Sequence, residues 1–291
     1  MKSPLKLGIP KGSLQSATIA LFKRSGWQIN VNGRSYFPEI DDDTIDCAIC
    51  RAQEMSRYVE NGTLEAGLTG KDWIAENNSD VHIVTDLVYS KVSSRPARWV
   101  LAVPYDSDIN SLEDLQGKKI ATELTAYTER YFRERNIQVT VEFSWGATEA
   151  KVVSGLADAI VEVTETGSTI KAHGLKIIHN LMETNTQLIA NHTAWKNQEK
   201  RQKIEQIALL LKGALLGEKL VGLKMNVPQN RLNDIVKILP SLNAPTIASL
   251  YQSDWFSVET VVNVNVVRDL IPDLLKTGAE GIIEYPLNKV V

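Results

Sequence analysis

The chain has 291 residues, of which 43% are hydrophobic and 23% are charged, and its formal net charge at pH 7 is −3. This composition is typical of a globular protein long enough for two or three domains. The slightly acidic balance argues against a protein that coats nucleic acid or lies on a membrane, because either function requires a basic face. We find no export signal and no apolar stretch approaching the roughly 20 residues of a membrane span. We therefore expect a cytoplasmic protein with no membrane or nucleic-acid partner.

Short apolar strands alternate with helices along the first half of the chain. Such alternation predicts parallel sheets with helices on both faces. In chain order we expect a strand at 5–9, a helix at 14–25, a helix at 51–61, a strand at 64–68, a helix at 73–77, a strand at 99–103, a capped helix and a strand within 111–122, a helix at 125–135, a strand at 139–143 and a helix at 148–154.

Cys47 and Cys50 form a Cys-x-x-Cys pair, and they are the two cysteines of the chain. The pair lies in an apolar run that reads as a strand, whereas a redox dithiol normally lies at the start of a helix. No further zinc ligands stand nearby in the sequence. We expect neither a redox nor a zinc function for this pair.

The segment 155–175 reads GLADAIVEVTETGSTIKAHGL and predicts a strand at 159–163, a turn at 164–168 and a first helical turn at 169–173. Backbone N–H groups of such a turn, with the positive end of the following helix, bind anions. The side-chain hydroxyls of Thr166, Ser168 and Thr169 add hydrogen-bond donors, and Gly167 permits close approach of the backbone to a ligand. The same pattern also fits an ordinary helix start with Thr166 or Ser168 as the N-cap. Both readings stay open on the pattern alone.

Acidic residues distinguish this turn from other phosphate loops. Asp158, Glu162 and Glu165 flank it, and it lacks both the lysine of a P-loop and the three glycines of a dinucleotide site. Carboxylates beside an anion site make sense if the ligand also carries hydroxyl groups or a metal ion. A phosphorylated sugar meets both requirements.

A looser copy of this pattern occurs at 59–76, which runs helix, glycine, apolar strand, polar turn and helix. Its turn holds Gly70, Lys71 and Asp72. Each turn would lie at the carboxyl end of a strand, where open α/β sheets bind ligands. Two lobes would then face one cleft with two polar turns.

The pattern changes after a helix at 197–216. A βαββαβ order follows, and this order is typical of a small ferredoxin-like domain. We expect it to be regulatory or oligomerising, because it carries no cluster of nucleophile, base or metal ligands. The expected elements are a strand at 220–226, a helix at 231–239, strands at 246–251 and 256–264, a helix at 267–277 and a strand at 281–285.

The segments LGIPKGSL, CRAQEMSRYVENGTLEAGLTGKDW and GLADAIVEVTETGSTIKAHGL together resemble ATP phosphoribosyltransferase, and the C-terminal KMNVP, WFSVETVVNV and LIPDLLKTGAEGI resemble the regulatory domain of its long form. The similarity covers nearly the whole chain. It implies an α/β fold with two lobes like those of type II periplasmic binding proteins around a cleft, followed by a ferredoxin-like (ACT-like) regulatory domain. The implied domains are a first catalytic lobe at 1–97, completed by about 180–216, a second at 98–179 and the regulatory domain at 217–291.

The same resemblance implies an activity and its ligands. Phosphoribosyl would pass from phosphoribosyl pyrophosphate to N1 of ATP, with Mg²⁺ required and histidine as an allosteric inhibitor, in a homo-oligomer that changes from dimer to hexamer. One departure concerns Ser13, because the family usually has arginine at this position of the N-terminal turn. One basic contact to the ligand is then missing, or another residue of the chain supplies it.

We assign site residues on this basis. Lys11, Arg51 and Lys71 are assigned to the pyrophosphate and triphosphate groups, and Gly70 and Asp72 to the first substrate-binding turn. The 5-phosphate is assigned to the second turn, and the ribose or its Mg²⁺ to Asp158 and Glu165, with Glu162 ranked last. N1 of adenine is a neutral nucleophile, so no catalytic base is required. The residues of the second turn are Thr164, Thr166, Gly167, Ser168 and Thr169.

Two other functions share the two-lobed plan. A noncatalytic solute-binding or sensor protein also has polar turns that face a cleft, but it usually carries an export signal or a DNA-binding segment. A prephenate-dehydratase-like enzyme also joins two lobes to a small regulatory domain, but its chemistry has no use for a phosphate loop. His173, near the turn, more commonly offsets a helix dipole than takes part in catalysis.

Overall fold

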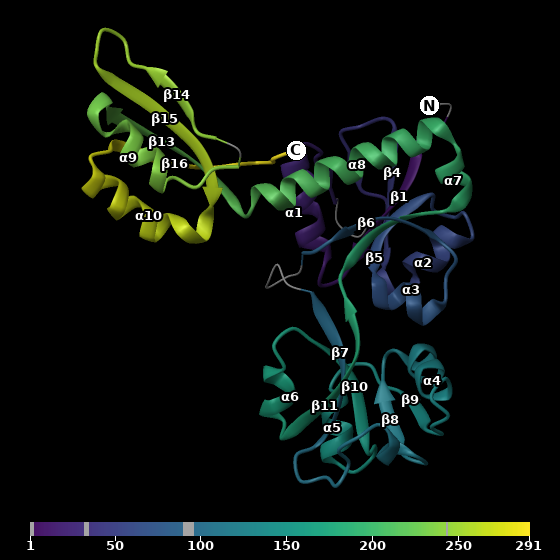
Figure 1. Cartoon of the computed structure of the whole chain (residues 1–291). Helices are drawn as coiled ribbons and strands as arrows, with labels where there is room; N and C mark the ends of the chain where they lie inside the picture. The colour runs from purple at the N-terminus through teal and green to yellow at the C-terminus, as the bar shows by residue number, and fades with distance from the viewer. Residues whose placement is uncertain (1–2, 32–34, 90–95, 243) are drawn as a thin grey trace. The chain divides into compact units, whose positions relative to one another are not determined.

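The chain divides into two compact units, Met1–Ala20 with Trp27–Ala208 and Leu21–Gly26 with Leu209–Val291. The computed structural model describes residues 3–31, 35–89, 96–242 and 244–291. The first unit contains two five-stranded sheets, and the second contains one four-stranded sheet (Figure 1). The long helix α8 (Gln198–Gly217) begins in the first unit and ends in the second.

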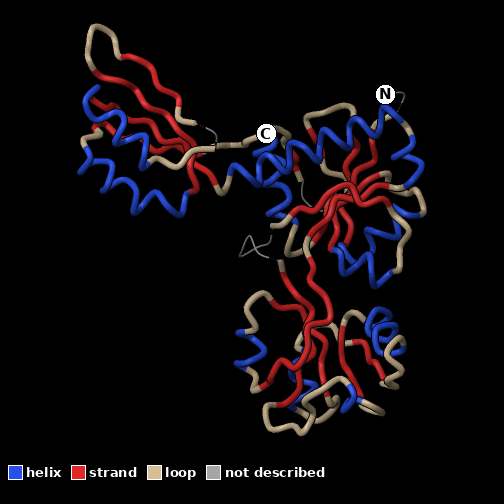
Figure 2. The backbone as a smooth tube through the Cα atoms, in the orientation of Figure 1, coloured by secondary structure: helices blue, strands red, loops and turns tan. Residues whose placement is uncertain are grey.

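The first sheet, with the helices on it, is the first lobe. Its strand order is β4-β1-β5-β12-β6, with β1 parallel to β4 and β5, and β12 antiparallel to β5 and β6. The central strands read as apolar runs because helices cover both faces, as the blue and red tubes of Figure 2 show. The elements are β1 (Leu5–Lys11), α1 (Gln15–Ser25), β2 (Ile29–Asn30), β3 (Glu39–Ile40), β4 (Ile45–Arg51), α2 (Ala52–Glu60), β5 (Ala66–Gly70), α3 (Lys71–Asn77), β6 (His82–Leu87), β12 (Thr186–Ala190) and α7 (His192–Lys196).

The second sheet, with its helices, is the second lobe. Its order is β11-β7-β10-β8-β9, with β8, β9 and β10 parallel and β7 antiparallel to both β10 and β11. Successive residues of β7 enter different cores, Trp99 and Leu101 on one face and Val100 and Ala102 on the other. The elements are β7 (Ala97–Pro104), η1 (Glu113–Leu115), β8 (Lys119–Thr122), α4 (Thr125–Arg133), β9 (Thr140–Phe143), α5 (Thr148–Val153), β10 (Ala159–Thr164), α6 (Ser168–Ala172) and β11 (Leu175–Thr184).

The sheets predicted to be parallel are mixed, because β7, β11 and β12 run antiparallel to their neighbours. Parallel neighbours require a crossover connection, usually a helix. Here only Asn185 separates β11 of the second sheet from β12 of the first. A strand that arrives from the other lobe has no crossover helix to set its direction. The α/β class and the two-lobed plan are confirmed.

The third sheet confirms the ferredoxin-like prediction. Its order is β14-β15-β13-β16 with antiparallel neighbours throughout. Side chains of the two helices pack with one face of the sheet, and Leu223, Met225 and Val258 meet Ile235 and Leu274 there. The elements are β13 (Leu220–Pro228), η2 (Gln229–Arg231), α9 (Leu232–Ile238), β14 (Thr246–Ser249), β15 (Trp255–Asn263), α10 (Val264–Thr277) and β16 (Glu280–Pro286).

Among the described residues, no helix combines the length and the apolar character that crossing a membrane requires.

The core of the second lobe gives a stability prediction. Phe132 in α4 is fully buried against Trp99 and Leu101. Phe132→Ala leaves a cavity and is expected to lower the free energy of unfolding by about 3–5 kcal/mol. Phe37→Ala, at a side chain that is 76% exposed, is the matched control. Urea unfolding followed by circular dichroism measures both, and equal losses in the two variants would contradict the assigned core.

Candidate active site

Carboxyl ends of strands from both lobes line one cavity of about 580 Å³. β1 ends at Lys11, β4 at Arg51 and β5 at Gly70, and these three parallel strands end at the same edge of their sheet. From the second lobe, Glu123 follows the end of β8, and Glu162 precedes the end of β10. This is the edge at which α/β sheets bind ligands.

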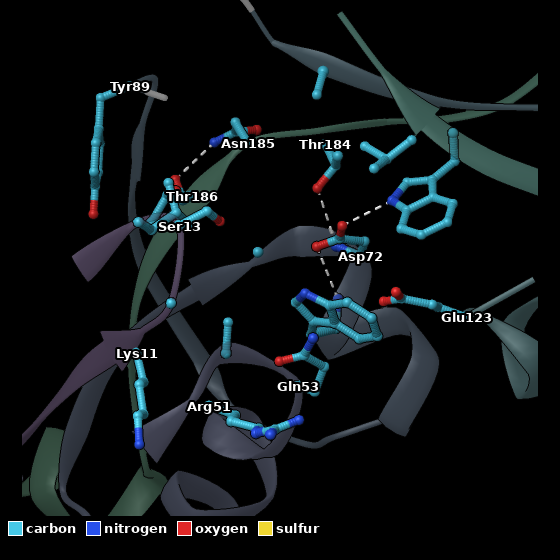
Figure 3. A pocket seen from close by; sticks show the side chains of 18 of the residues that line it. Lys11, Ser13, Arg51, Gln53, Asp72, Tyr89, Glu123, Thr184, Asn185 and Thr186 are labelled. Atoms are coloured by element: carbon cyan, nitrogen blue, oxygen red, sulfur yellow. Dashed lines mark hydrogen bonds between the residues drawn. The ribbon is translucent and has the colours of Figure 1, made fainter. Parts of the chain in front are cut away.

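Two of the predicted cations lie next to each other in the cavity. Lys11 and Arg51 are register partners of β1 and β4, and Figure 3 shows them along one side of the pocket. Lys11 Nζ donates to the Tyr36 hydroxyl at 3.3 Å, and the Arg51 guanidinium lies 5.3 Å from the ring centroid of Trp145. Within the described part of the chain neither cation is paired with a carboxylate. Both are therefore available to an anionic ligand.

Lys71 takes a different position. It begins α3, and its backbone N–H donates to the carbonyl of Asn185 at 3.0 Å. Side-chain hydrogen bonds from Asn185 and Gln187 lower the pKa of Asp86, and the charge of Lys71 adds a smaller lowering effect. The structure places Gly70 and Asp72 in the cavity wall but does not place Lys71 there.

Asp72 is a buried carboxylate, 6% exposed, at the seam of the two lobes. Its Oδ2 accepts a 2.7 Å hydrogen bond from Nε1 of Trp99, which belongs to β7, and its Oδ1 accepts from the backbone N–H of Trp73 at 3.0 Å. Burial raises the pKa of Asp72, and these hydrogen bonds oppose part of the rise. A Cβ on Gly70 would lie 2.0 Å from Asp72 Oδ1. A side chain at Gly70, two residues before Asp72, would therefore displace this carboxylate.

Two further carboxyl groups, Glu123 and Glu162, line the same cavity. Burial, and then the charge of Asp72, raises the pKa of Glu123. Burial is also the main cause that raises the pKa of Glu162, with added repulsion from Glu149 and Glu123. Glu162 is the acid ranked last among the three predicted from sequence, and Glu123 is absent from that prediction. The available signal was its position directly after an apolar strand, in KIATE.

The turn after β10 holds itself together through its own hydroxyls. Thr164 Oγ1 accepts from the N–H of Gly167 at 2.8 Å, and Thr166 Oγ1 accepts from the N–H of Ser168 at 3.3 Å. The N-cap residue of α6 is Gly167, with φ of 77° and no side-chain cap bond, so it lies between Thr166 and Ser168, the two N-cap candidates of the alternative reading. Thr166, Ser168 and Thr169 are exposed. The turn extends from the same strand end as Glu162, beyond the cavity wall.

Asp158 and Glu165 lie at opposite ends of β10, so the expected shared Mg²⁺ site does not form. The backbone N–H of Lys119 donates to Asp158 at 2.9 Å, at the amino end of the strand. A strand rises about 3.3 Å per residue, so six residues separate the two carboxylates by roughly 20 Å. Among the described residues no cluster of three or more acidic, histidine or cysteine side chains is placed to hold a metal ion.

The cysteines and His173 lie outside the cavity wall. Burial raises the pKa of both the Cys47 and Cys50 thiols to about 12, so both thiols are protonated at neutral pH. Both cysteines lie in β4, which confirms the strand predicted for this pair. His173 Nδ1 lies 2.9 Å from the carbonyl of Thr169, within its own helix.

Helices α3 and α4 join the lobes through reciprocal end contacts. Glu76 of α3 accepts from the backbone N–H groups of Ala126 at 3.0 Å and Tyr127 at 2.8 Å, at the start of α4. Arg130 of α4 donates to the carbonyls of Ala75 and Glu76, at the end of α3. Each contact satisfies backbone groups that a helix end leaves unpaired. With the Asp72–Trp99 bond, they connect α3 to the second lobe.

Comparison with known proteins adds the following. A family model described as "HisG: ATP phosphoribosyltransferase" matches residues 51–213, and "HisG, C-terminal domain" matches residues 217–289. Curated ATP phosphoribosyltransferases of Desulfosudis oleivorans and Desulfatibacillum aliphaticivorans are 74% and 72% identical over the full length of both chains. The ATP phosphoribosyl transferase (HisG:HisZ) complex from Thermotoga maritima matches with a TM-score of 0.61 and 25% identity, over 71% of this chain and 98% of that chain. These matches favour the transferase over the binding-protein and dehydratase alternatives.

The burial of Asp72 predicts a specific pH dependence. Burial raises its pKa in the folded protein above the usual value of 3.8, so its contribution to stability is full below that pH and is lost as the pH rises through the folded pKa. Asp72→Asn removes this titration. The free energy of unfolding of the variant minus that of the original protein should therefore increase with pH above about 4. Denaturant titrations between pH 4 and pH 8 measure this difference, and a difference that decreases with pH would overturn the assignment.

Proposed function

The chain belongs to the ATP phosphoribosyltransferase family of histidine biosynthesis, and we propose that it transfers phosphoribosyl from phosphoribosyl pyrophosphate to N1 of ATP. The products are phosphoribosyl-ATP and pyrophosphate. The observation that carries this proposal is the cavity at the strand ends, which sets Lys11 and Arg51 on one lobe against carboxyl groups of the other.

The reaction needs both kinds of charge. The lone pair of N1 forms a bond to C1 of the ribose, and the bond from C1 to the pyrophosphate oxygen breaks with its electron pair on the leaving group. The transition state is cationic at the sugar and increasingly negative on the pyrophosphate. Lys11 and Arg51 stabilise the leaving group, and Glu162 faces the cationic sugar. Histidines are not required in this scheme.

The 5-phosphate binds at the turn formed by Thr166, Gly167, Ser168 and Thr169. Phosphate oxygens would replace the internal bonds that Thr164 and Thr166 now make to the N–H groups of Gly167 and Ser168. Glu165 stands beside the turn as an acceptor for ribose hydroxyls. The phosphate is remote from the reacting bond, so its binding contributes positioning energy.

Magnesium enters this scheme with the substrates. The described residues hold no cluster for a metal ion of the protein's own, and Mg²⁺ prefers phosphate oxygens, waters and one or two carboxylates. We propose that it binds as the chelate of phosphoribosyl pyrophosphate, with a cavity carboxylate as one ligand.

Regulation is assigned to the C-terminal unit. The C-terminal family model covers residues 217–289, which contain β13–β16 with their helices. We propose that histidine binds this unit and inhibits the enzyme allosterically, in a homo-oligomer that changes from dimer to hexamer. The cytoplasmic location expected from the sequence stays a prediction.

One assay tests the reaction directly. The purified protein is mixed with ATP, phosphoribosyl pyrophosphate and Mg²⁺, with and without histidine, and phosphoribosyl-ATP is detected by mass spectrometry. Formation of phosphoribosyl-ATP that requires ATP, phosphoribosyl pyrophosphate and Mg²⁺ together supports the proposal. A folded protein that forms none under these conditions refutes it.

Gly167 supplies a prediction for the phosphate turn. A Cβ at this residue would lie 3.1 Å from Ile177 Cδ1, and φ is 77°. Gly167→Ala is expected to raise the KM for phosphoribosyl pyrophosphate about 5- to 30-fold, because a side chain in the left-handed region costs roughly 1–2 kcal/mol. Gly155→Ala is the control, because Gly155 has a similar φ of 73° outside the turn. An unchanged KM in Gly167→Ala would remove the turn from the substrate site.

Deletion of all residues after Leu216 tests the regulatory assignment. The truncated enzyme is expected to retain phosphoribosyl transfer and to lose inhibition by histidine, because the deleted residues include the whole third sheet. Circular dichroism confirms that the remaining unit is folded. If the folded, truncated enzyme is still inhibited, the histidine site lies elsewhere.

A further inference from the structure

A second cavity, of about 390 Å³, adjoins the first. The two cavities share Arg51, Gln53, Trp73, Glu123 and Trp145 as wall residues. Glu123 therefore stands where they meet. Figure 3 shows it reaching into the pocket from the side opposite Lys11.

Two exposed aromatic side chains form a wall of the second cavity. Phe143 ends β9 and is 65% exposed, and Trp145 follows it and is 67% exposed. The residue between them, Ser144, is buried, and its Oγ donates to the Thr148 hydroxyl at 3.2 Å. Because side chains alternate along an extended chain, the inward-facing side chain of Ser144 means that Phe143 and Trp145 face outward. Aromatic faces exposed beside cations such as Arg51 are typical of sites that stack nucleobases.

Glu123 has no hydrogen-bond donor among the described residues, although its side chain is half-buried. Its backbone is fixed, because the next residue, Leu124, is fully buried and its N–H donates to Thr122 Oγ1 at 3.0 Å. The charge of Asp72 acts on Glu123, and the charge of Glu123 in turn acts on Glu162. A carboxylate held beside other acids without a donor has unused acceptor capacity. A donor group or positive charge on a ligand would fill it.

We propose that Trp145 and Glu123 form the subsite for the adenine base of ATP. Trp145 stacks on the base, and the Glu123 carboxylate accepts a hydrogen bond from the amino group on C6. This inference rests on the proposed function and assigns two residues within it.

Glu123 then acts on the reaction as well as on binding. When the lone pair of N1 forms the bond to C1 and pyrophosphate leaves with the C1–O electron pair, the base becomes a cation whose charge is shared by N1, C6 and the amino group. A carboxylate at the amino group stabilises this charge as it develops. The same carboxylate repels the C6 oxygen of guanine or hypoxanthine, so it also selects adenine.

The test compares two substrates. ATP is compared with purine riboside triphosphate, which keeps N1 but lacks the amino group on C6. Glu123→Gln keeps the size of the side chain and one acceptor oxygen but removes the charge. It is expected to lower kcat for ATP about 10- to 100-fold, the worth of a hydrogen bond to a charged group, with a smaller change in KM. Its effect on the analogue should be clearly smaller.

Matched variants separate stacking from general damage. Trp145→Ala is expected to raise the KM for ATP about tenfold or more while leaving the KM for phosphoribosyl pyrophosphate unchanged, and Trp145→Phe should restore most of the loss. Glu129→Gln, at an exposed acid of α4 that lines neither cavity, is the control and should change nothing. Equal losses with both substrates in Glu123→Gln, or a Trp145→Ala effect on phosphoribosyl pyrophosphate instead of ATP, would overturn the proposal.

A direct measurement of ATP binding tests the adenine subsite independently of the phosphoribosyl transfer reaction. ATP affinity is measured by calorimetry without the second substrate, in the original protein and in Trp145→Ala. Weaker binding in the variant supports the base subsite even if the original protein forms no phosphoribosyl-ATP. Equal affinity refutes the subsite even if the transfer reaction is confirmed.

Discussion

The hydrogen bond between Trp99 and Asp72 is the contact on which the cleft depends. It joins a helix of the first lobe to a strand of the second at 2.7 Å, inside the protein and in the wall of the cavity at the strand ends. A buried carboxylate without a donor is costly, so the indole must stay in place and fixes the spacing of the lobes at this seam. Glu76 and Arg130 add reciprocal caps between α3 and α4. The seven-residue helix α3 thus takes part in each of these polar contacts between the lobes.

The charge distribution of the cavity follows from the two sheets. The first contributes Lys11 and Arg51, and the second contributes Glu123 and Glu162. The transition state of phosphoribosyl transfer has the complementary charges, because the leaving group becomes negative while the sugar and the base become cationic. A cavity with cations on one wall and acids on the other stabilises both without moving a proton. Burial raises the pKa of Glu123 and of Glu162, and the same burial strengthens the interaction of their carboxylates with a cationic ligand.

Sequence patterns predicted the elements well and the contacts less well. Apolar runs and glycine stops located most strands and helices within a few residues, because local periodicity reports burial of one face. They gave no prediction for β2, β3, β6, β11, β12 or α7. They did not reveal that β7, β11 and β12 run antiparallel, since strand direction depends on how the chain crosses between lobes. Sequence patterns also suggested that Asp158 and Glu165 share a site, because both flank one short segment. That segment is a β-strand, and an extended strand holds the residues at its two ends far apart.

The sequence by itself determined the family, the plan of two lobes followed by a ferredoxin-like domain, and the chemistry available in the turns, because these depend on residue type and on order along the chain. The tertiary structure decided which of those residues share a cavity. It brought together Glu123 and Asp72, which lie far apart in the sequence, and left Lys71 outside the cavity wall. It also closed the phosphate turn on itself through Thr164. The reason is that a site forms where strand ends from different parts of the chain meet, and only the folded chain sets those distances.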